Sequence, residues 1–137
     1  MTVARGLAPH ERLRRRPEFE RAYSEGTRVN ARFMTVIVVP NAGTHPRLGV
    51  AASRKLGAAV RRNRAKRRAR ELFRCHKNGP VFETQPGLDV VIVPRREMSD
   101  APFSDVEADF KRALERCRES ARRTSGHGAR RRAPRTS

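Results

Sequence analysis

The segment from Arg54 to Arg74 constrains the fold of this chain most, because it has the periodicity of a helix and a charge that such a helix cannot neutralise. Ten of its 21 residues are basic, and Glu71 is its only acid. Like charges four residues apart destabilise an isolated helix by roughly 0.2–0.5 kcal/mol per pair. The helix therefore needs a surface on which to dock, and one narrow apolar stripe could make that contact: Ala65, Ala69, Leu72 and Phe73.

The charge of the whole chain favours an anionic partner. Its 137 residues include 32 Lys and Arg against 14 Asp and Glu, which gives a formal net charge of +18. No fold needs such an excess, and self-repulsion destabilises the compact state. Coding bias toward Arg and a merely solvated helix face are the alternatives, but a solvated face usually carries both signs. The composition therefore favours nucleic-acid binding, without separating RNA from DNA.

Three helices are expected. Pro17 and Gly26 bound the first, and the second runs from about Ala58 to His76. A capping box of Ser104 and Glu107 should begin the last helix, because the two side chains can satisfy each other's free backbone amides. Its buried face should then consist of Val106, Phe110, Leu114, Cys117 and Ala121.

Three main strands are expected, at residues 33–39, 47–53 and 88–93, and a short strand at 27–30 is possible. The turn residues Asn41-Ala42-Gly43 separate the first two main strands, which should form a hairpin. The run at 88–93 is almost continuously apolar, which is typical of a central strand buried on both faces.

This order of elements predicts an α+β fold, α-β-β-β-α-β-α, as a two-layer sandwich with helices packed on one sheet. One domain should span residues 13–120, after a flexible basic N-terminus at 1–12. Residues 121–137 contain six Arg and no acid and lose the apolar pattern. We expect a disordered Arg-rich tail there.

No protein catalytic centre and no metal site are expected. Cys75 and Cys117 lack a C-x-x-C spacing and fit two free thiols in a reducing, cytoplasmic compartment. Cys117 lies on the apolar stripe of the last helix. The four His residues are scattered, and paired carboxylates or a nucleotide-binding glycine loop do not occur. No apolar run approaches the roughly 18 residues of a membrane span, so no membrane partner is expected.

An ordered set of motifs resembles the signature of the bacterial ribonuclease P protein component. Its centre is an Arg-Asn-Arg triplet followed by Lys-Arg, here Arg62-Asn63-Arg64 and Lys66-Arg67. The flanking matches are Arg47-Leu48-Gly49-Val50, Ser53-Arg54-Lys55-Leu56-Gly57, Ala59-Val60-Arg61 and Arg70-Glu71. The resemblance covers roughly residues 10–120. Arg54 stands where the family more often has Lys, and the Arg-rich tail lies outside the family core.

The resemblance implies the protein subunit of ribonuclease P, which joins a large catalytic RNA to remove the 5′ leader of precursor tRNA. The RNA, with bound Mg²⁺, would perform the endonucleolytic hydrolysis, and the protein alone would bind neither a metal nor a small-molecule substrate. A four-stranded sheet with an unusual left-handed βαβ crossover through the basic helix is also implied. A ribosomal or RNA-chaperone protein and a self-sufficient endonuclease are the rival functions.

The resemblance also implies an RNA-binding face on the basic helix, directed toward the catalytic RNA or the cleavage site. The residues of this face would be Arg61, Arg62, Asn63, Arg64, Lys66, Arg67, Arg68 and Arg70. Their charges would let polyanionic RNAs approach. Asn63 is the neutral member, and a structural amide hydrogen bond is its alternative role.

A second implied surface is a cleft between the first helix and the sheet, which would hold the single-stranded leader. Phe19, Tyr23 and Phe33 would supply aromatic faces for unpaired bases. Arg47 and Lys55 could meet leader phosphates. The alternative for Phe19 and Phe33 is that both are simply core residues, whereas the hydroxyl of Tyr23 favours a wet edge.

Overall fold

The computed structural model describes the backbone of residues 8–126 and the side chains of residues 8–120. Its helices are α1 (Arg16–Glu25), α2 (Ala59–His76), α3 (Pro80–Thr84) and α4 (Phe103–Gly126), with the 3₁₀ helices η1 (Pro9–Glu11), η2 (Arg54–Leu56) and η3 (Arg96–Ser99). Its strands are β1 (Thr27–Asn30), β2 (Met34–Pro40), β3 (Arg47–Val50) and β4 (Leu88–Pro94). The three long helices and the strands, β1 included, are confirmed, whereas α3 is too short to carry a periodic signal.

One mixed sheet organises the fold, with the strand order β1-β2-β4-β3. β2 pairs antiparallel with β1 and with β4, and β3 pairs parallel with β4. The hairpin expected between β2 and β3 is therefore wrong, because β4 lies between them. β4 is buried along nearly its whole length. Its apolar run thus takes the central position that was predicted, with a strand on each side.

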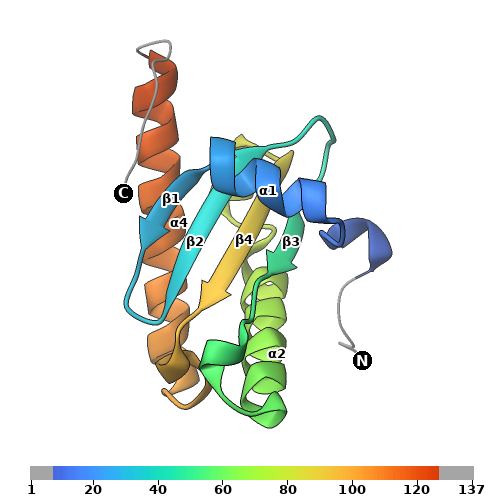
Figure 1. Cartoon of the computed structure of the whole chain (residues 1–137). Coiled ribbons are helices and arrows are strands. Elements are labelled where there is room, and N and C mark those ends of the chain that lie inside the picture. The colour runs from blue at the N-terminus through green and yellow to red at the C-terminus, as the bar shows by residue number, and fades with distance from the viewer. Residues whose placement is uncertain (1–7, 127–137) are drawn as a thin grey trace.

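Helices cover the two faces of this sheet unequally. α2 and α4 pack on one face, where the main core includes Val36, Phe73 and Phe110. α1 crosses the opposite face, in front of the sheet in Figure 1, over a smaller cluster that includes Ala22 and Ile37. The predicted α+β class with helices packed on a four-stranded sheet is confirmed, and α1 leaves part of its own face uncovered.

The connection from β3 to β4 has the rare hand. In Figure 1 both strands point downward, β4 lies to the left of β3, and α2 lies behind the sheet. A chain that passes from β3 through α2 to β4 in these positions makes a left-handed crossover. Parallel strands are joined by right-handed crossovers in about 98% of cases. The unusual unit that the family resemblance implies is therefore present.

The N-terminal segment is packed against the domain, so the expectation of a flexible stretch at 1–12 is wrong for residues 8–12. The backbone amide of Leu13 donates to the Leu48 carbonyl at 2.9 Å, and Arg12 forms a parallel bridge with Leu48. Lys77, just after α2, pairs with Glu11 at 2.5 Å. These contacts attach the segment to β3 and α2. Residues 1–7 lie outside the described residues.

α4 differs from its prediction at both ends. The Val106 amide donates to the Pro102 carbonyl at 3.2 Å, so Ser104 lies inside the first turn and the predicted capping box is wrong. The apolar stripe is confirmed for Val106, Phe110, Leu114 and Cys117, which are all buried, and the side chain of Ala121 lies outside the described residues. The helix continues to Gly126, so the disordered tail is wrong for 121–126, where Ala and Arg favour a helix. Residues 127–137 lie outside the described residues.

No helix in the described part of the chain is both long and apolar enough to cross a membrane. Both cysteines are free thiols, with Cys75 exposed and Cys117 buried in the core as predicted.

Candidate nucleic-acid interface

The basic helix α2 docks on the sheet through the stripe predicted for it. Its buried residues are Ala65, Ala69, Leu72 and Phe73. At the N-terminal end, Gly57 has a φ of 112°, a left-handed conformation that glycine adopts without strain, and it turns the chain from η2 into α2. With the stripe buried, the basic residues divide into two flanks and an outward row.

The first flank contains Arg61, Arg64 and Arg68, and it is bonded to the connection between β4 and α4. Arg68 Nη1 donates to the carbonyls of Met98 at 3.0 Å and Ala101 at 2.6 Å. Arg61 Nη1 donates to Asp100 Oδ2 at 2.6 Å, and Arg64 Nη1 reaches Asp100 Oδ1 at 3.5 Å. The guanidinium groups of Arg61 and Arg68 thus also bond within the fold, in addition to the RNA-facing position that the family resemblance implies for them.

The second flank contains Arg62, Lys66 and Arg70, beside the edge of β3. Arg62 donates to the Gly57 carbonyl at 2.9 Å. Lys66 and Arg70 make no side-chain hydrogen bond or ion pair with any described residue. Partial burial and the nearby charges of Arg12 and Arg67 lower the pKa of Arg70. Burial is the largest of these causes, and no acidic side chain is among them.

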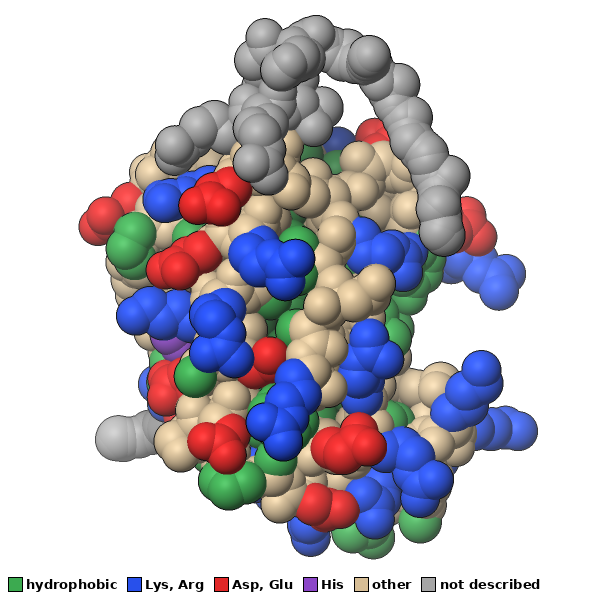
Figure 2. Space-filling model, turned by 90° about the vertical axis from the view of Figure 1, so that its left-hand side faces the viewer, with side chains coloured by type: hydrophobic (Ala, Val, Ile, Leu, Met, Phe, Trp, Pro, Cys, Tyr) green, Lys and Arg blue, Asp and Glu red, His purple; other side chains and the backbone are tan. Residues whose placement is uncertain are grey.

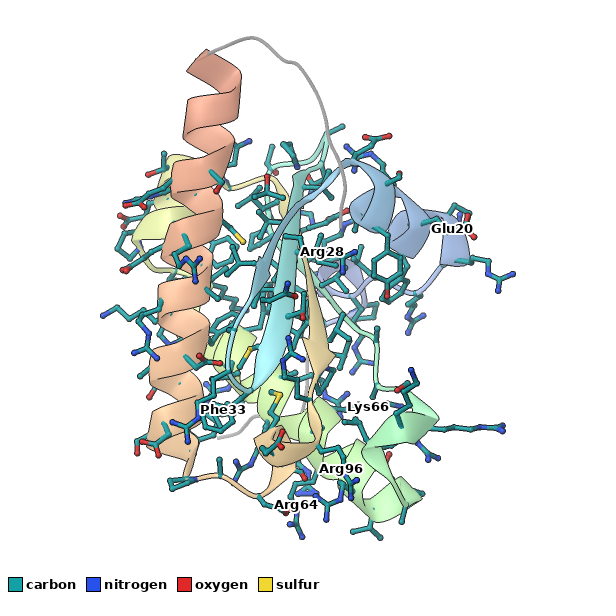
Figure 3. The ribbon with its side chains drawn as sticks, turned by 60° about the vertical axis from the view of Figure 1, so that its left-hand side comes forward. Glu20, Arg28, Phe33, Arg64, Lys66 and Arg96 are labelled. Atoms are coloured by element: carbon teal, nitrogen blue, oxygen red, sulfur yellow. The ribbon has the colours of Figure 1, made fainter. Side chains whose placement is uncertain are left out.

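The outward row consists of Asn63 and Arg67, both exposed and without a hydrogen bond to the described residues. This removes the alternative that Asn63 serves a structural amide bond within that part of the chain. We name the set of Asn63, Lys66, Arg67 and Arg70 the open cationic row. Figure 3 places Lys66 at the same end of the molecule as Arg64 and Arg96.

The side of the molecule that carries β1 and α4 offers a contrast. Acidic and basic side chains alternate over this face in Figure 2. Both signs also meet within individual elements, as in the pair of Arg112 with Asp109 at 3.7 Å on α4. A solvated surface mixes charges in this way. Lys66, Arg67 and Arg70 of the open cationic row, by contrast, have no ion pair with a described acid.

The predicted leader-binding cleft would lie where α1 meets the sheet face opposite α2 and α4, and we call this predicted surface the groove. Phe19 is half-buried and Tyr23 is 43% exposed. A Cβ on Gly49 of β3 would come within 2.7 Å of the Phe19 ring, so this glycine allows α1 to lie close to the sheet. The side chain of Lys55, on η2, is exposed. Phe19, Tyr23 and Lys55 are therefore compatible with the predicted cleft.

Phe33 and Arg47 are positioned differently from their predictions. Phe33 is 5% exposed and packs in the main core on the face of α2 and α4, so its core alternative is the correct one. Arg47 is bonded to two acids, with Nε and Nη2 at 2.8 Å from the oxygens of Asp89 and Nη1 at 3.0 Å from Glu18. It attaches α1 to β4, and its charge is already compensated.

The far border of the groove contains polar residues that the sequence patterns did not single out. Val29 of β1 is buried toward α4, so Arg28 and Asn30 point to the face on which α1 lies. Thr35 donates to Asn30 Oδ1 at 2.9 Å, and Arg95 donates to the Ala31 carbonyl at 3.1 Å. The only sequence signal for these residues is period-2 alternation in a four-residue strand, which is too short to interpret.

Nuclease chemistry by the protein would need acids or metal ligands that converge. Within the described ranges, no group of three or more His, Cys, Asp or Glu side chains is placed to hold a metal ion. The acids near α2 are occupied instead by cations, as Asp100 and Glu71 show. The fold and this surface together define a nucleic-acid-binding α+β protein whose basic helix presents positive charge on a rigid sheet.

Comparisons with known proteins identify the family. The Ribonuclease P family model matches residues 7–118. The ribonuclease P protein component of Oleidesulfovibrio alaskensis is 40% identical over 94 residues, which cover 67% of this chain and 72% of that protein. The solved RNase P protein of Thermotoga maritima aligns with a TM-score of 0.67 and 34% identity over 77% of this chain and 96% of that one. For the Staphylococcus aureus protein the TM-score is 0.66, with 30% identity and coverages of 77% and 93%.

The chain belongs to the ribonuclease P protein family. The predicted resemblance is confirmed, and with it the role of a subunit of a tRNA-processing endoribonuclease.

Proposed function

We propose that this chain binds the catalytic RNA of ribonuclease P through α2 and the 5′ leader of precursor tRNA through the groove beside α1. The observation that carries the proposal is the open cationic row, in which Lys66, Arg67 and Arg70 lie on one rigid helix without a described acidic partner. Phosphates of a large RNA would replace the missing anions and release condensed counterions.

The groove suits a single strand of variable sequence. Tyr23 is 43% exposed on α1, the helix that covers the smaller apolar cluster of the sheet. Aromatic stacking contributes roughly 1–3 kcal/mol per base and tolerates any base, because each has a π face. Exposed Lys55 would neutralise a backbone phosphate at the rim.

The chemistry would belong to the RNA. The surface near α2 is cationic and offers no cluster of carboxylates in the described part, so a magnesium ion would be held by RNA phosphates rather than by this chain. The protein would act by neutralising RNA–RNA repulsion, which should lower the magnesium concentration needed for cleavage. We place this role in the cytoplasm, where reduced Cys75 and Cys117 fit the redox state.

Reconstitution with the catalytic RNA at low magnesium tests the proposal. Replacing both Lys66 and Arg70 with Ala should weaken assembly and raise the magnesium requirement, because two phosphate contacts are lost. The matched control replaces Lys111 and Arg116, two exposed cations of α4 that have no described partner. Equal effects of the two double substitutions would contradict a specific RNA face on α2.

The rival reading, an RNA chaperone or ribosomal protein, predicts no preference for an unprocessed substrate. Binding of precursor tRNA and of mature tRNA to the reconstituted complex should therefore be compared. We expect tighter binding when the leader is present, and a loss of this preference on Tyr23→Ala. Equal affinities of the native protein for both RNAs would favour the rival.

A further inference from the structure

One acidic side chain contacts the basic residues of α2. Asp100, in the turn between η3 and α4, accepts hydrogen bonds from Arg61 at 2.6 Å and from Arg64 at 3.5 Å. Its side chain remains 55% exposed. A carboxylate between two guanidinium groups occupies the position that an RNA phosphate would take, because both anions present oxygens to the same N–H donors.

The backbone around Asp100 is fixed on both sides. Arg68 donates to the carbonyl of Met98, before it, and to that of Ala101, after it. The Asp100 amide donates to the Glu97 carbonyl at 3.2 Å. The carboxylate also accepts a hydrogen bond from Ser99 Oγ at 3.4 Å. By rotating its own side chain into solvent it could leave Ser99 and the two arginines with no movement of the turn.

We propose that Asp100 fills a phosphate-binding site formed by Arg61 and Arg64, and that a phosphodiester of a docked RNA replaces it. The inference rests on the proposed function and adds a means of selection to it. Arg61 also donates to Ser99 Oγ at 3.2 Å, which keeps its guanidinium in place when the carboxylate moves away.

The selection arises from effective concentration. Asp100 competes as an intramolecular ligand, so a phosphate of a short or weakly bound RNA is at a disadvantage. When a structured RNA already contacts the open cationic row, its next phosphate is held near Arg61 and Arg64 and also has a high effective concentration. That phosphate then competes with the Asp100 carboxylate on equal terms. Asp100 thus lowers the affinity of the chain for arbitrary RNA, while it lowers the affinity for the catalytic RNA only slightly.

The experiment compares the full-length chain with its Asp100→Asn variant by titration with a short oligouridylate at several salt concentrations. One additional phosphate contact should steepen the log–log salt dependence by about 0.7 for single-stranded RNA. We expect affinity for the oligouridylate to rise about two- to fivefold, which is the usual range for one exposed ion pair. Affinity for the catalytic RNA should rise by less.

Asp105→Asn is the matched control, because Asp105 is exposed, undergoes the same change of charge and has no described cationic partner. Asp100→Glu should behave like the native chain, and thermal melting checks that all variants fold. Equal gains for Asp100→Asn and Asp105→Asn, or an unchanged salt slope for Asp100→Asn, would overturn the proposal that Asp100 competes with RNA phosphates. If the native chain binds neither RNA, the proposed function itself fails, which is a different result.

Discussion

Replacing Arg47 with Met should separate the folding role of basic residues from their role in RNA binding. Arg47 makes two hydrogen bonds of 2.8 Å to Asp89 and one of 3.0 Å to Glu18. Met keeps the aliphatic volume but removes all three donors. Asp89, whose side chain is 1% exposed, then keeps Asn41 Nδ2 at 2.8 Å as its remaining side-chain donor among the described residues.

The magnitude follows from this burial. Removing one partner of a buried ion pair costs about 3–5 kcal/mol. Arg47 retains 27% exposure and Asn41 stays in place, so we expect the free energy of unfolding to fall by about 2–3 kcal/mol. In a domain of this size, that loss corresponds to a decrease in Tm of about 10 °C. Hydrogen bonds to Asp89 and its charge raise the pKa of Arg47 despite burial, so the effect should persist at alkaline pH.

Arg47→Met should also weaken leader binding, because Glu18 no longer fixes α1 over the sheet. Thermal unfolding gives the stability, and competition between precursor and mature tRNA in the reconstituted complex gives the leader preference. Assembly with the catalytic RNA should change little below the melting transition, since Arg47 lies outside the open cationic row.

Arg112→Met provides the control. Arg112 also lies beside a buried acid, Asp109, but at 3.7 Å and with 67% exposure, and Asp109 already accepts the amides of Arg32 and Phe33. Exposed pairs contribute about 0–1 kcal/mol. Similar Tm values for Arg47→Met and the native chain, or equal losses for the two variants, would refute the reasoning from burial.

Three further predictions concern the groove and its supports. Tyr23→Ala should reduce affinity for leader-bearing tRNA by roughly 1–3 kcal/mol, while Tyr23→Phe should preserve it; direct titration of both variants distinguishes stacking from hydrogen bonding. Gly49→Ala should lower the free energy of unfolding by about 1–3 kcal/mol, because the added methyl group would lie 2.7 Å from Phe19 and 3.0 Å from Leu13. Gly43→Ala, where the methyl group would meet only the side chain of Asn41 at 3.2 Å, is the milder comparison for denaturant unfolding. Burial raises the pKa of Glu18, but amide hydrogen bonds from Arg15 and Arg14 and the charge of Arg47 outweigh burial, so the pKa is lowered in the folded state. The ionised carboxylate therefore stabilises the fold above its ordinary pKa of 4.5, and this contribution is lost as the pH falls through the lower, folded pKa. Tm should decline on acidification, and less so in Glu18→Gln.

Periodicity predicted which residues would be buried more reliably than it predicted their partners. The stripe of α2 and the central position of β4 follow from local patterns of apolar residues, and both are confirmed. The hairpin of β2 with β3 was wrong because strand order depends on a crossover that local sequence does not specify. β4 is distant in sequence, yet it pairs with both β2 and β3.

The candidate site shows the same limit. Composition located the basic helix, but it could not show that Arg47 meets acids 29 and 42 residues away. Phe33 has the residue type of a stacking platform, yet its position beside α4 buries it. Whether a cation or an aromatic ring is available to a ligand depends on tertiary contacts, which a motif does not encode.

The division of α2 into flanks determines how substitutions in this helix should be interpreted. Arg68 bonds two carbonyls of the β4–α4 connection, so removing it displaces η3 and alters the position of Asp100 at the same time. A loss of RNA binding in an Arg68 variant would therefore combine a folding defect with a binding defect. Lys66 and Arg70 have no such bonds in the described part of the chain, so their substitution disturbs the fold less and reports on RNA binding more directly. Because one flank bonds to the fold and the other has no described acidic partner, substitutions in the second flank are the sharper test of the proposed RNA contact.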